Sequence, residues 1–285
     1  MTPAGGTGTA GGCHPRRTYA VKIACLQTAC GPTDFPQTLD RLRDAAGKAA
    51  AEGAELLLAP EMTIGGYPLQ HAALARSAGT AEGPQCTAVS EIAREAGIAM
   101  AHGWPERDGA HLYNAVRLVG RDGRPLAVYR KAHLYGRAEH ELFTPGGNGV
   151  VQASLGGLTV GMLICYDVEF PEAVRAHALA GTDLLLVPTG LMSPWDFVAR
   201  TLVPARAFES QLYVAYANWT GEHGGLRFCG RSTIAAPDGT VECLGPATAS
   251  AGDQLLFGEV DPTTLASARR TTTYLSDRRP ELYGG

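Results

Sequence analysis

The sequence predicts a single α/β domain, on the basis of three observations. Short apolar runs typical of strands alternate with segments whose apolar residues recur at helical spacing. Two of these runs, ELLLAP at residues 55–60 and DLLLVP at residues 183–188, resemble each other and suggest two related halves. No linker rich in proline and glycine separates the halves. We therefore expect sheets that are covered by helices within one domain.

The first part of the chain predicts alternating strands and helices. Residues 21–27 alternate in polarity as a strand does, and residues 36–53 carry their apolar side chains on one helix face, with Gly53 suited to the C-cap. Residues 55–60 are continuously apolar, as expected for a strand that is buried on both faces. A second helix is expected over residues 84–96 and a strand over residues 98–104.

A hairpin and a further series of strands and helices are predicted next. The hairpin has arms at residues 113–119 and 126–129, joined by the turn sequence GRDG. The other expected elements are strands at residues 150–153, 158–164, 183–188, 212–218, 229–235 and 254–260, and helices at residues 171–180 and 195–210. Pro171 suits the first turn of a helix.

The two ends of the chain differ from the middle. Residues 1–18 are rich in glycine, threonine and alanine and lack the apolar stretch of a secretory signal, so we predict a disordered tail. The polar residues 263–285 are predicted to form a C-terminal arm. Residues 19–262, between these two ends, are predicted to form the domain.

The composition indicates a folded protein with a substantial core. Hydrophobic residues make up 45% and charged residues 18% of the 285 residues. The net charge of −4 and the lack of a long lysine and arginine run give no electrostatic basis for binding nucleic acid or an anionic membrane. No apolar segment approaches the roughly 18 residues of a membrane-spanning helix. We therefore expect neither nucleic acid nor a membrane among the partners.

The seven cysteines favour reduced thiols. Their number is odd, no two of them form a CxxC pair, and the chain is long, which argues against a disulfide framework and against a zinc site. The histidine, aspartate and cysteine residues are not spaced as metal ligands. We therefore predict a cytoplasmic protein that uses no metal and no other cofactor.

Three polar residues come directly after predicted strands. Glu61 follows LLLAP, Lys131 follows LAVYR, and Cys165 follows VGMLI. In α/β folds the ends of strands bring side chains to a common rim, where sites are built. A thiolate can act as a nucleophile, a carboxylate can accept the thiol proton, and an ammonium can stabilise the oxyanion that develops on a carbonyl substrate.

Each of the three residues also has an ordinary structural interpretation. A cysteine at a strand end is usually a small buried apolar residue, and a glutamate there is more often a solvated loop residue or a cap. A lysine near Arg130, His133 and Arg137 is more often part of a charged surface. It is the joint occurrence of the three residues within longer motifs that favours catalysis.

These motifs are APEMTIGGYP at residues 59–68, YRKAHLYG at residues 129–136 and ICYDVEFPE at residues 164–172. In order and spacing they resemble the nitrilase (carbon–nitrogen hydrolase) superfamily, and the resemblance covers residues 21–260. It implies a four-layer αββα sandwich and a Glu–Lys–Cys catalytic set. It also implies association as a homodimer or a larger homo-oligomer.

The resemblance implies a role for each motif residue. Glu61 is the expected general base, and Cys165 is the expected nucleophile, which forms a thioester with the substrate. Lys131 is expected to stabilise the tetrahedral oxyanion together with the backbone N–H of Tyr166.

A second glutamate of the family precedes a phenylalanine and a glycine after the lysine motif. Glu139 matches it, since Phe143 and Gly146 follow, and we assign Glu139 to the positioning of the lysine or of the substrate. Glu141, two residues further on, is the alternative. We expect Asp167 to be engaged in structural hydrogen bonds, because a negative charge adjacent to a thiol raises the thiol pKa. We expect His133 to serve packing or hydrogen bonding.

The residues that follow the nucleophile predict the substrate class. In this family a Cys-Tyr-Asp sequence, here Cys165 to Asp167, accompanies amidases and carbamoylases, whereas Cys-Trp-Glu marks nitrilases. The longer segments CYDVEFPE, VPTGLM and CGRSTIAAPDG resemble the ω-amino amide amidases, which include 5-aminopentanamidase. This resemblance implies a small aliphatic amide with a positive charge.

A cationic substrate needs an acidic or aromatic partner in the pocket. The candidates are Glu169, Trp195, Asp196 and Glu222, and each also suits an ordinary role as a cap, a surface acid or a packing aromatic. The leading hypothesis is therefore a thiol amidase that releases ammonia. The alternatives are an N-carbamoyl amine or amino-acid amidohydrolase, which releases carbon dioxide as well, and a non-catalytic amide-binding scaffold, against which the complete catalytic set argues.

Overall fold

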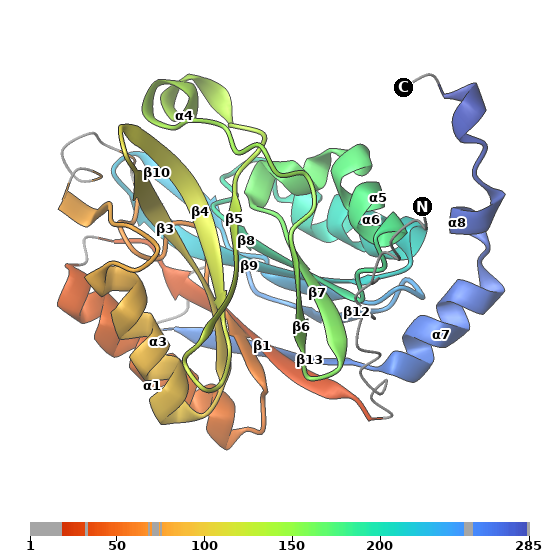
Figure 1. The fold of residues 1–285 in the computed structure, drawn as a ribbon, viewed down its shortest axis with the longest axis horizontal. Helices are drawn as coiled ribbons and strands as arrows, with labels where there is room; N and C mark the ends of the chain where they lie inside the picture. The colour runs from red at the N-terminus through yellow and green to blue at the C-terminus, as the bar shows by residue number, and fades with distance from the viewer. Residues whose placement is uncertain are drawn as a thin grey trace, which may run out of the picture.

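Two stacked β-sheets between two layers of helices make up the chain, as the computed structural model in Figure 1 shows. The structure describes residues 19–31, 34–67, 69, 74, 76–247 and 253–283. The predicted disordered tail, residues 1–18, lies outside the described residues. The α/β class and the four-layer αββα sandwich that the sequence predicts are both confirmed.

In the described part of the chain, the first sheet has six strands, and β1 is next to its edge strand β13. Its strands are, in spatial order, β13 (Gln254–Val260), β1 (Val21–Ala29), β2 (Leu56–Leu58), β3 (Ala99–Asp108), β4 (His111–Val119) and β5 (Pro125–Arg130). Neighbouring strands from β1 to β3 are parallel, and β4 and β5 add the predicted antiparallel hairpin. The run of apolar residues at β2 is fully buried, as expected for a strand covered on both faces.

The second sheet repeats this plan. Its strands are, in spatial order, β6 (Gln152–Leu155), β7 (Leu158–Met162), β8 (Leu184–Thr189), β9 (Tyr213–His223), β11 (Thr233–Ala235) and β12 (Val241–Leu244), with β10 (Leu226–Cys229) paired to the far end of β9. Strands β7, β8 and β9 are parallel. The two sheets join where the end of β1 pairs with β9, at Thr28 opposite Trp219.

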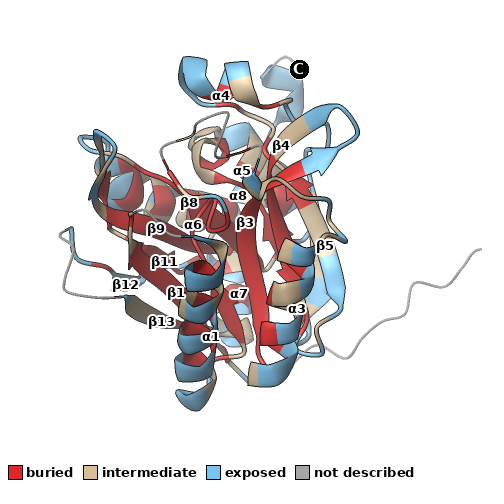
Figure 2. Ribbon diagram, turned by 90° about the vertical axis from the view of Figure 1, so that its left-hand side faces the viewer, coloured by how far each residue is buried: buried red, intermediate tan, exposed pale blue. Residues whose placement is uncertain are grey.

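Helices cover the outer face of each sheet. Helices α1 (Phe35–Ala51) and α3 (Pro84–Ala96) lie against the first sheet, and α5 (Pro171–Leu179) and α6 (Val203–Ser210) lie against the second (Figures 1 and 2). Successive residues of β1 therefore face different layers of the sandwich. Ile23 belongs to the core between the sheets, whereas Ala24 packs with α1 and α3.

Local sequence explains where the helices of the first layer begin and end. The Asp34 side chain accepts a hydrogen bond from Gln37 N and caps α1, whose buried face is formed by Leu42 and alanines. Helix α3 begins at a proline and ends before Gly97, which adopts a left-handed conformation with φ 66°. The predicted bounds of α3 agree with the structure, since both of its ends carry a strong signal.

Four features differ from the expected elements. Residues 195–210 form a π-helical turn at Val198–Leu202 and then α6, instead of one helix. The expected strand at 229–235 is two strands, because Gly230 and Arg231 both have positive φ and break it. Helix α4 (Gly136–Leu142) and strand β12 were not predicted.

The segment 263–285, expected as an arm, begins within a helix that packs on the domain. Helix α7 spans Pro262–Thr271 and is followed by α8 (Tyr274–Asp277). Arg269 of α7 forms an ion pair of 3.0 Å with Asp183, and Gln211 donates a hydrogen bond of 3.0 Å to Ala268 O. These contacts hold α7 against the second half of the chain, near the start of β8.

Among the described residues, no helix is both long enough and apolar enough to span a membrane.

A core substitution tests the layer between α1 and the first sheet. Leu42 is fully buried in that layer, so Leu42→Ala should lower the free energy of unfolding by about 2–5 kcal/mol through lost burial and the cavity left behind. Chemical denaturation followed by circular dichroism measures the change. Arg43→Ala, at an exposed position of the same helix, is the control. Equal stability of Leu42→Ala and the wild type would contradict this packing.

Candidate active site

The three residues that follow predicted strands lie in turns at strand ends. Glu61 is in the turn after β2, Lys131 comes directly after β5, and Cys165 follows β7 by three residues. The turn with Glu61 packs directly on β3, because a Cβ atom at Gly103 would lie 2.4 Å from Met62 N. Only a glycine at position 103 allows this close approach.

Lys131 lies between two carboxylates in the interior. Its Nζ atom is 2.8 Å from Glu61 Oε1 and 2.8 Å from Glu139 Oε1, and all three side chains are buried. Asn114 Nδ2 donates a second hydrogen bond of 2.7 Å to Glu61 Oε1. The backbone N–H of Tyr135 donates one of 2.7 Å to Glu139 Oε2. Every member of this Glu61–Lys131–Glu139 cluster therefore has charged or polar partners, as buried ions require.

Burial and charge act in opposite directions on the cluster. Burial alone lowers the pKa of Lys131, but Glu61 and Glu139 outweigh it and raise this pKa well above its usual value. Burial raises the pKa of Glu139, and the neighbouring Lys131 opposes that rise only in part. With both carboxylates ionised the cluster carries one net negative charge in a buried site. It is therefore well suited to accept a proton.

Cys165 occupies a strained position at the start of a 3-10 turn. The turn covers Cys165–Glu169, and the φ angle of Cys165 is 47°, in the left-handed region that costs a non-glycine residue about 1–3 kcal/mol. Burial raises the pKa of the Cys165 thiol, and so does the charge of Glu61, while Lys131 lowers it. Hydrogen bonds with Thr189 and with the Gly190 backbone also lower it. The net effect is a rise, so the resting group is a neutral thiol that needs a nearby base.

Asp167 links the strained turn to the segment that carries Lys131. Its buried carboxylate accepts hydrogen bonds from Ile164 N at 3.0 Å and from Tyr129 Oη at 2.9 Å. It also accepts one from His133 N at 2.9 Å and lies 2.7 Å from His133 Nδ1. The His133 ring stacks on Phe170 with 3.9 Å between the ring centroids. The hydrogen-bonding expectations for Asp167 and His133 are thus confirmed.

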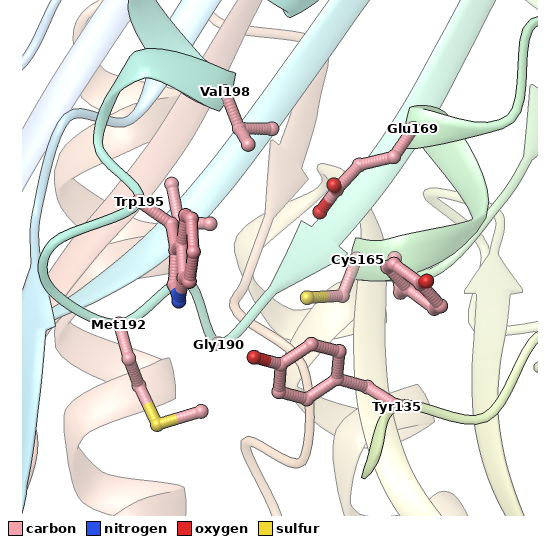
Figure 3. A pocket seen from close by; sticks show the side chains of 9 residues that line it. Tyr135, Cys165, Glu169, Gly190, Met192, Trp195 and Val198 are labelled. Carbon is pink, nitrogen blue, oxygen red and sulfur yellow. The ribbon is translucent and has the colours of Figure 1, made fainter.

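A pocket opens beside the thiol. Figure 3 shows the Cys165 thiol and the Glu169 carboxylate directed into one space, with Trp195 facing them across it. The lining residues are Tyr135, Cys165, Tyr166, Glu169, Gly190, Leu191, Met192, Trp195 and Val198. Arg206 fixes the turn below Glu169 by donating hydrogen bonds to Val168 O at 3.1 Å and Glu169 O at 2.8 Å. The pocket walls are therefore mostly apolar and aromatic, with one carboxylate.

The structure places some of the candidate residues at the site and others away from it. It brings Glu61, Lys131 and Glu139 into contact, and Glu169 and Trp195 into the pocket that Cys165 lines. Asp196 is not among the lining residues and pairs instead with Arg200 at 3.0 Å. The alternative glutamate, Glu141, is exposed and pairs with Arg137, and Glu222 is exposed near the end of β9.

Sequence reasoning missed several residues that contact this site. Tyr67 forms a hydrogen bond with Glu61, and Asn114 donates to the same carboxylate. Thr189 and Gly190 lie beside the thiol at the end of β8. A signal existed for Tyr67, which belongs to the TIGGYP segment, and for Asn114, a polar residue within the apolar strand YNAVRLV.

Among the described residues, no group of three or more histidine, cysteine, aspartate and glutamate side chains could hold a metal ion. Six cysteines are described, and all six are free thiols.

The αββα sandwich and the thiol beside a buried Glu–Lys–Glu cluster agree with the carbon–nitrogen hydrolases that the sequence motifs resemble. Residues 22–270 match the family model of the carbon–nitrogen hydrolases. The chain belongs to this family, and the predicted family and enzyme class are confirmed.

Two curated relatives are similar over most of the chain. The hydrolase in the pqqF 5' region of Pseudomonas protegens is 43% identical over 265 residues, which cover 92% of this chain and 90% of that protein. An (R)-stereoselective amidase of a Pseudomonas species is 34% identical, with 93% of each chain covered.

A solved amidase from a Nesterenkonia species has the same fold. It is 36% identical to this chain with a TM-score of 0.82, and the match covers 94% of this chain and 96% of the amidase. Two variants of that amidase, each 35% identical with a TM-score of 0.81 and covering 92% of this chain, hold ligands. One is in complex with butyramide, and the other carries the acetamide moiety of fluoroacetamide on its active-site cysteine.

The buried cluster predicts unequal losses of stability for two substitutions. Lys131→Met leaves two buried carboxylates without their cation and should lower the free energy of unfolding by about 3–5 kcal/mol at neutral pH. Glu139→Gln leaves the Glu61–Lys131 pair and removes the excess negative charge, so it should cost much less. Chemical denaturation of both variants measures the difference, and an equal cost would contradict the charge balance proposed for the cluster.

The loss in free energy of unfolding caused by Lys131→Met should depend on pH in a defined direction. A carboxyl whose pKa is raised in the folded state, as that of Glu139 is, contributes stability at low pH that is lost as pH rises through the raised pKa. Removal of the Lys131 ammonium raises that pKa further. The cost of Lys131→Met should therefore be smaller at about pH 5 than at about pH 8. A cost that is constant across this range would contradict the assignment.

Proposed function

We propose that this chain is a thiol amidase that hydrolyses a small aliphatic carboxamide to a carboxylate and ammonia, and that the substrate carries a positive charge at its far end. One observation supports this most directly: the Cys165 thiol and the Glu169 carboxylate point into the same otherwise apolar and aromatic pocket. The thiol is placed to attack the amide carbonyl, and the carboxylate is placed to bind a cation.

Acylation begins with proton transfer from Cys165 to Glu61. The thiolate sulfur attacks the carbonyl carbon, and the electron pair of the C=O bond moves to oxygen. The oxyanion is stabilised by Lys131 Nζ and by the backbone N–H of Tyr166. When the intermediate collapses, the C–N bond breaks, Glu61 returns the proton to nitrogen, and ammonia leaves. The product is a thioester on Cys165.

Deacylation repeats these steps with water as the nucleophile. Glu61 accepts a proton from water, the hydroxyl oxygen bonds to the thioester carbon, and the same two donors stabilise the second oxyanion. The C–S bond breaks, the sulfur takes the proton from Glu61, and the product leaves as a carboxylic acid that ionises to the carboxylate in water. Glu139 keeps Lys131 charged and in place throughout, since its Oε1 lies 2.8 Å from Nζ.

The relatives support an amide substrate and leave its charge to be tested. The (R)-stereoselective amidase and the butyramide complex of the Nesterenkonia amidase point to small amides. A cationic tail is favoured by Glu169, because burial raises the pKa of its carboxyl and a bound ammonium would offset the cost of keeping it ionised. Trp195, half exposed at the pocket, offers an aromatic face to the same cation.

The catalytic set predicts the effect of single substitutions on ammonia release. Cys165→Ala should abolish turnover, and Glu61→Gln should lower kcat by roughly 10²-fold or more, because the thiol loses its base. Glu139→Gln should also lower kcat, whereas the exposed Glu141→Gln should retain wild-type activity and serves as its matched control. Ammonia release at the wild-type rate by Cys165→Ala would rule out the mechanism.

The pocket predicts a substrate preference that can be measured. Primary amides of increasing length, with and without a terminal amine, should show a higher kcat/KM for the amines, and Glu169→Gln should reduce that preference by roughly tenfold or more. Asp196→Asn is the matched control, since its carboxylate pairs with Arg200. N-carbamoylputrescine belongs in the series, and release of both ammonia and carbon dioxide at a higher rate than any amide would favour the carbamoyl alternative. An unchanged preference in Glu169→Gln would contradict the cationic substrate.

A further inference from the structure

Tyr67 is a buried phenol next to the catalytic groups. It lies six residues after Glu61 in the same turn region and is 8% exposed, and its ring packs against Phe228 with 5.2 Å between centroids. Its hydroxyl group forms a hydrogen bond with Glu61. Burial raises the pKa of Tyr67 well above its usual value, and the charges of Glu61 and Glu139 act in the same direction. The phenol therefore keeps its proton and acts as the donor to the carboxylate.

The two oxygen atoms of the Glu61 carboxylate have different surroundings. Oε1 accepts hydrogen bonds from Lys131 Nζ and Asn114 Nδ2, at 2.8 and 2.7 Å. Oε2 lies on the side of Gly190, where an added Cβ atom would be 3.1 Å from Oε2 and 2.9 Å from Tyr67 Oη. The backbone of Gly190 is also hydrogen-bonded with the Cys165 thiol. Gly190 thus lies next to three groups, namely Tyr67 Oη, Glu61 Oε2 and the Cys165 thiol.

We propose that Tyr67 is a positioning residue for the proton transfer from Cys165, and that its hydroxyl group holds Glu61 with Oε2 as the oxygen that receives the thiol proton. Oε1 already accepts hydrogen bonds from two donors, so Oε2 is the oxygen that can accept the proton. The Tyr67 hydroxyl fixes the orientation of this oxygen and stabilises the ionised carboxylate. A side chain at position 190 would occupy the space in which these groups meet. The proposal rests on the proposed function of Cys165 and Glu61.

Removal of the hydroxyl group tests the positioning role. Tyr67→Phe keeps the ring that packs on Phe228 and deletes one donor to the Glu61 carboxylate. A carboxylate that this donor no longer holds receives the thiol proton less efficiently, so the rate of Cys165 alkylation and kcat/KM should both fall. A hydrogen bond to a charged group corresponds to roughly a tenfold to hundredfold loss.

The experiment measures the rate of Cys165 alkylation by iodoacetamide against pH, together with kcat/KM for butyramide. Wild type, Tyr67→Phe, Glu61→Gln and the double variant Glu61→Gln/Tyr67→Phe are compared. Tyr213→Phe is the matched control, because it deletes a buried hydroxyl that accepts a hydrogen bond from Asp261 N at 3.3 Å in another part of the fold. Thermal unfolding of each variant separates loss of fold from loss of function.

The expected result is slower alkylation of Cys165 in Tyr67→Phe, no change in Tyr213→Phe, and no additional effect of Tyr67→Phe in the Glu61→Gln background. A Tyr67→Phe profile that coincides with wild type would overturn the proposal, and so would an equal effect with and without Glu61. If wild-type alkylation spreads over all cysteines instead of favouring Cys165, the proposed function itself fails.

Discussion

The buried ammonium of Lys131 is the constraint on which the rest of the structure depends. An ion of this kind is stable in the interior only if charged groups surround it, and here Glu61 and Glu139 do so at 2.8 Å each. These residues come from the turn after β2, the end of β5 and helix α4. The hairpin of β4 and β5 and the turn at Glu61 must therefore meet before the cluster can form. Trp219 Nε1, from the second sheet, donates to Glu61 O at 2.8 Å and joins the two halves at this point.

The thiol depends on the same cluster through a second buried group. Asp167 bonds to the residues on either side of Lys131, namely Tyr129 and His133, and to Ile164, which precedes Cys165. The strain at Cys165 is thus compensated by hydrogen bonds that also fix the lysine. His133 stacks on Phe170, and edge-to-face ring contacts continue from Phe170 through Tyr166 to Tyr135 at the pocket. The site and one pocket wall are consequently one connected unit, built before a substrate enters.

Elements with signals at both ends could be predicted from the sequence, and elements defined by distant contacts could not. Helix α3 has a proline at its start and a glycine after its end, and its bounds agree with the structure. The break between β10 and β11 depends on positive φ at Gly230 and Arg231, and the non-glycine residue gives no sequence signal for it. Asp196, which follows Trp195 in the sequence, was one of the acidic candidates for binding a cationic substrate, but its side chain pairs with Arg200 one helical turn away. Adjacent residues in a turn point in different directions, so sequence proximity does not place both in one cavity.

The sequence by itself determined the alternation of strands and helices, the residues that end the strands, and through its motifs the family and the Glu61, Lys131 and Cys165 set. These follow from local polarity and from residue order, which are properties of the chain before it folds. The tertiary structure decided which glutamate contacts the lysine, which oxygen of Glu61 accepts from Lys131 and Asn114, and which acid lines the same pocket as the thiol. It also placed Tyr67, Asn114 and Gly190 around the Glu61 carboxylate. These outcomes depend on distances between side chains far apart in the chain, and such distances are set only when the two sheets pack.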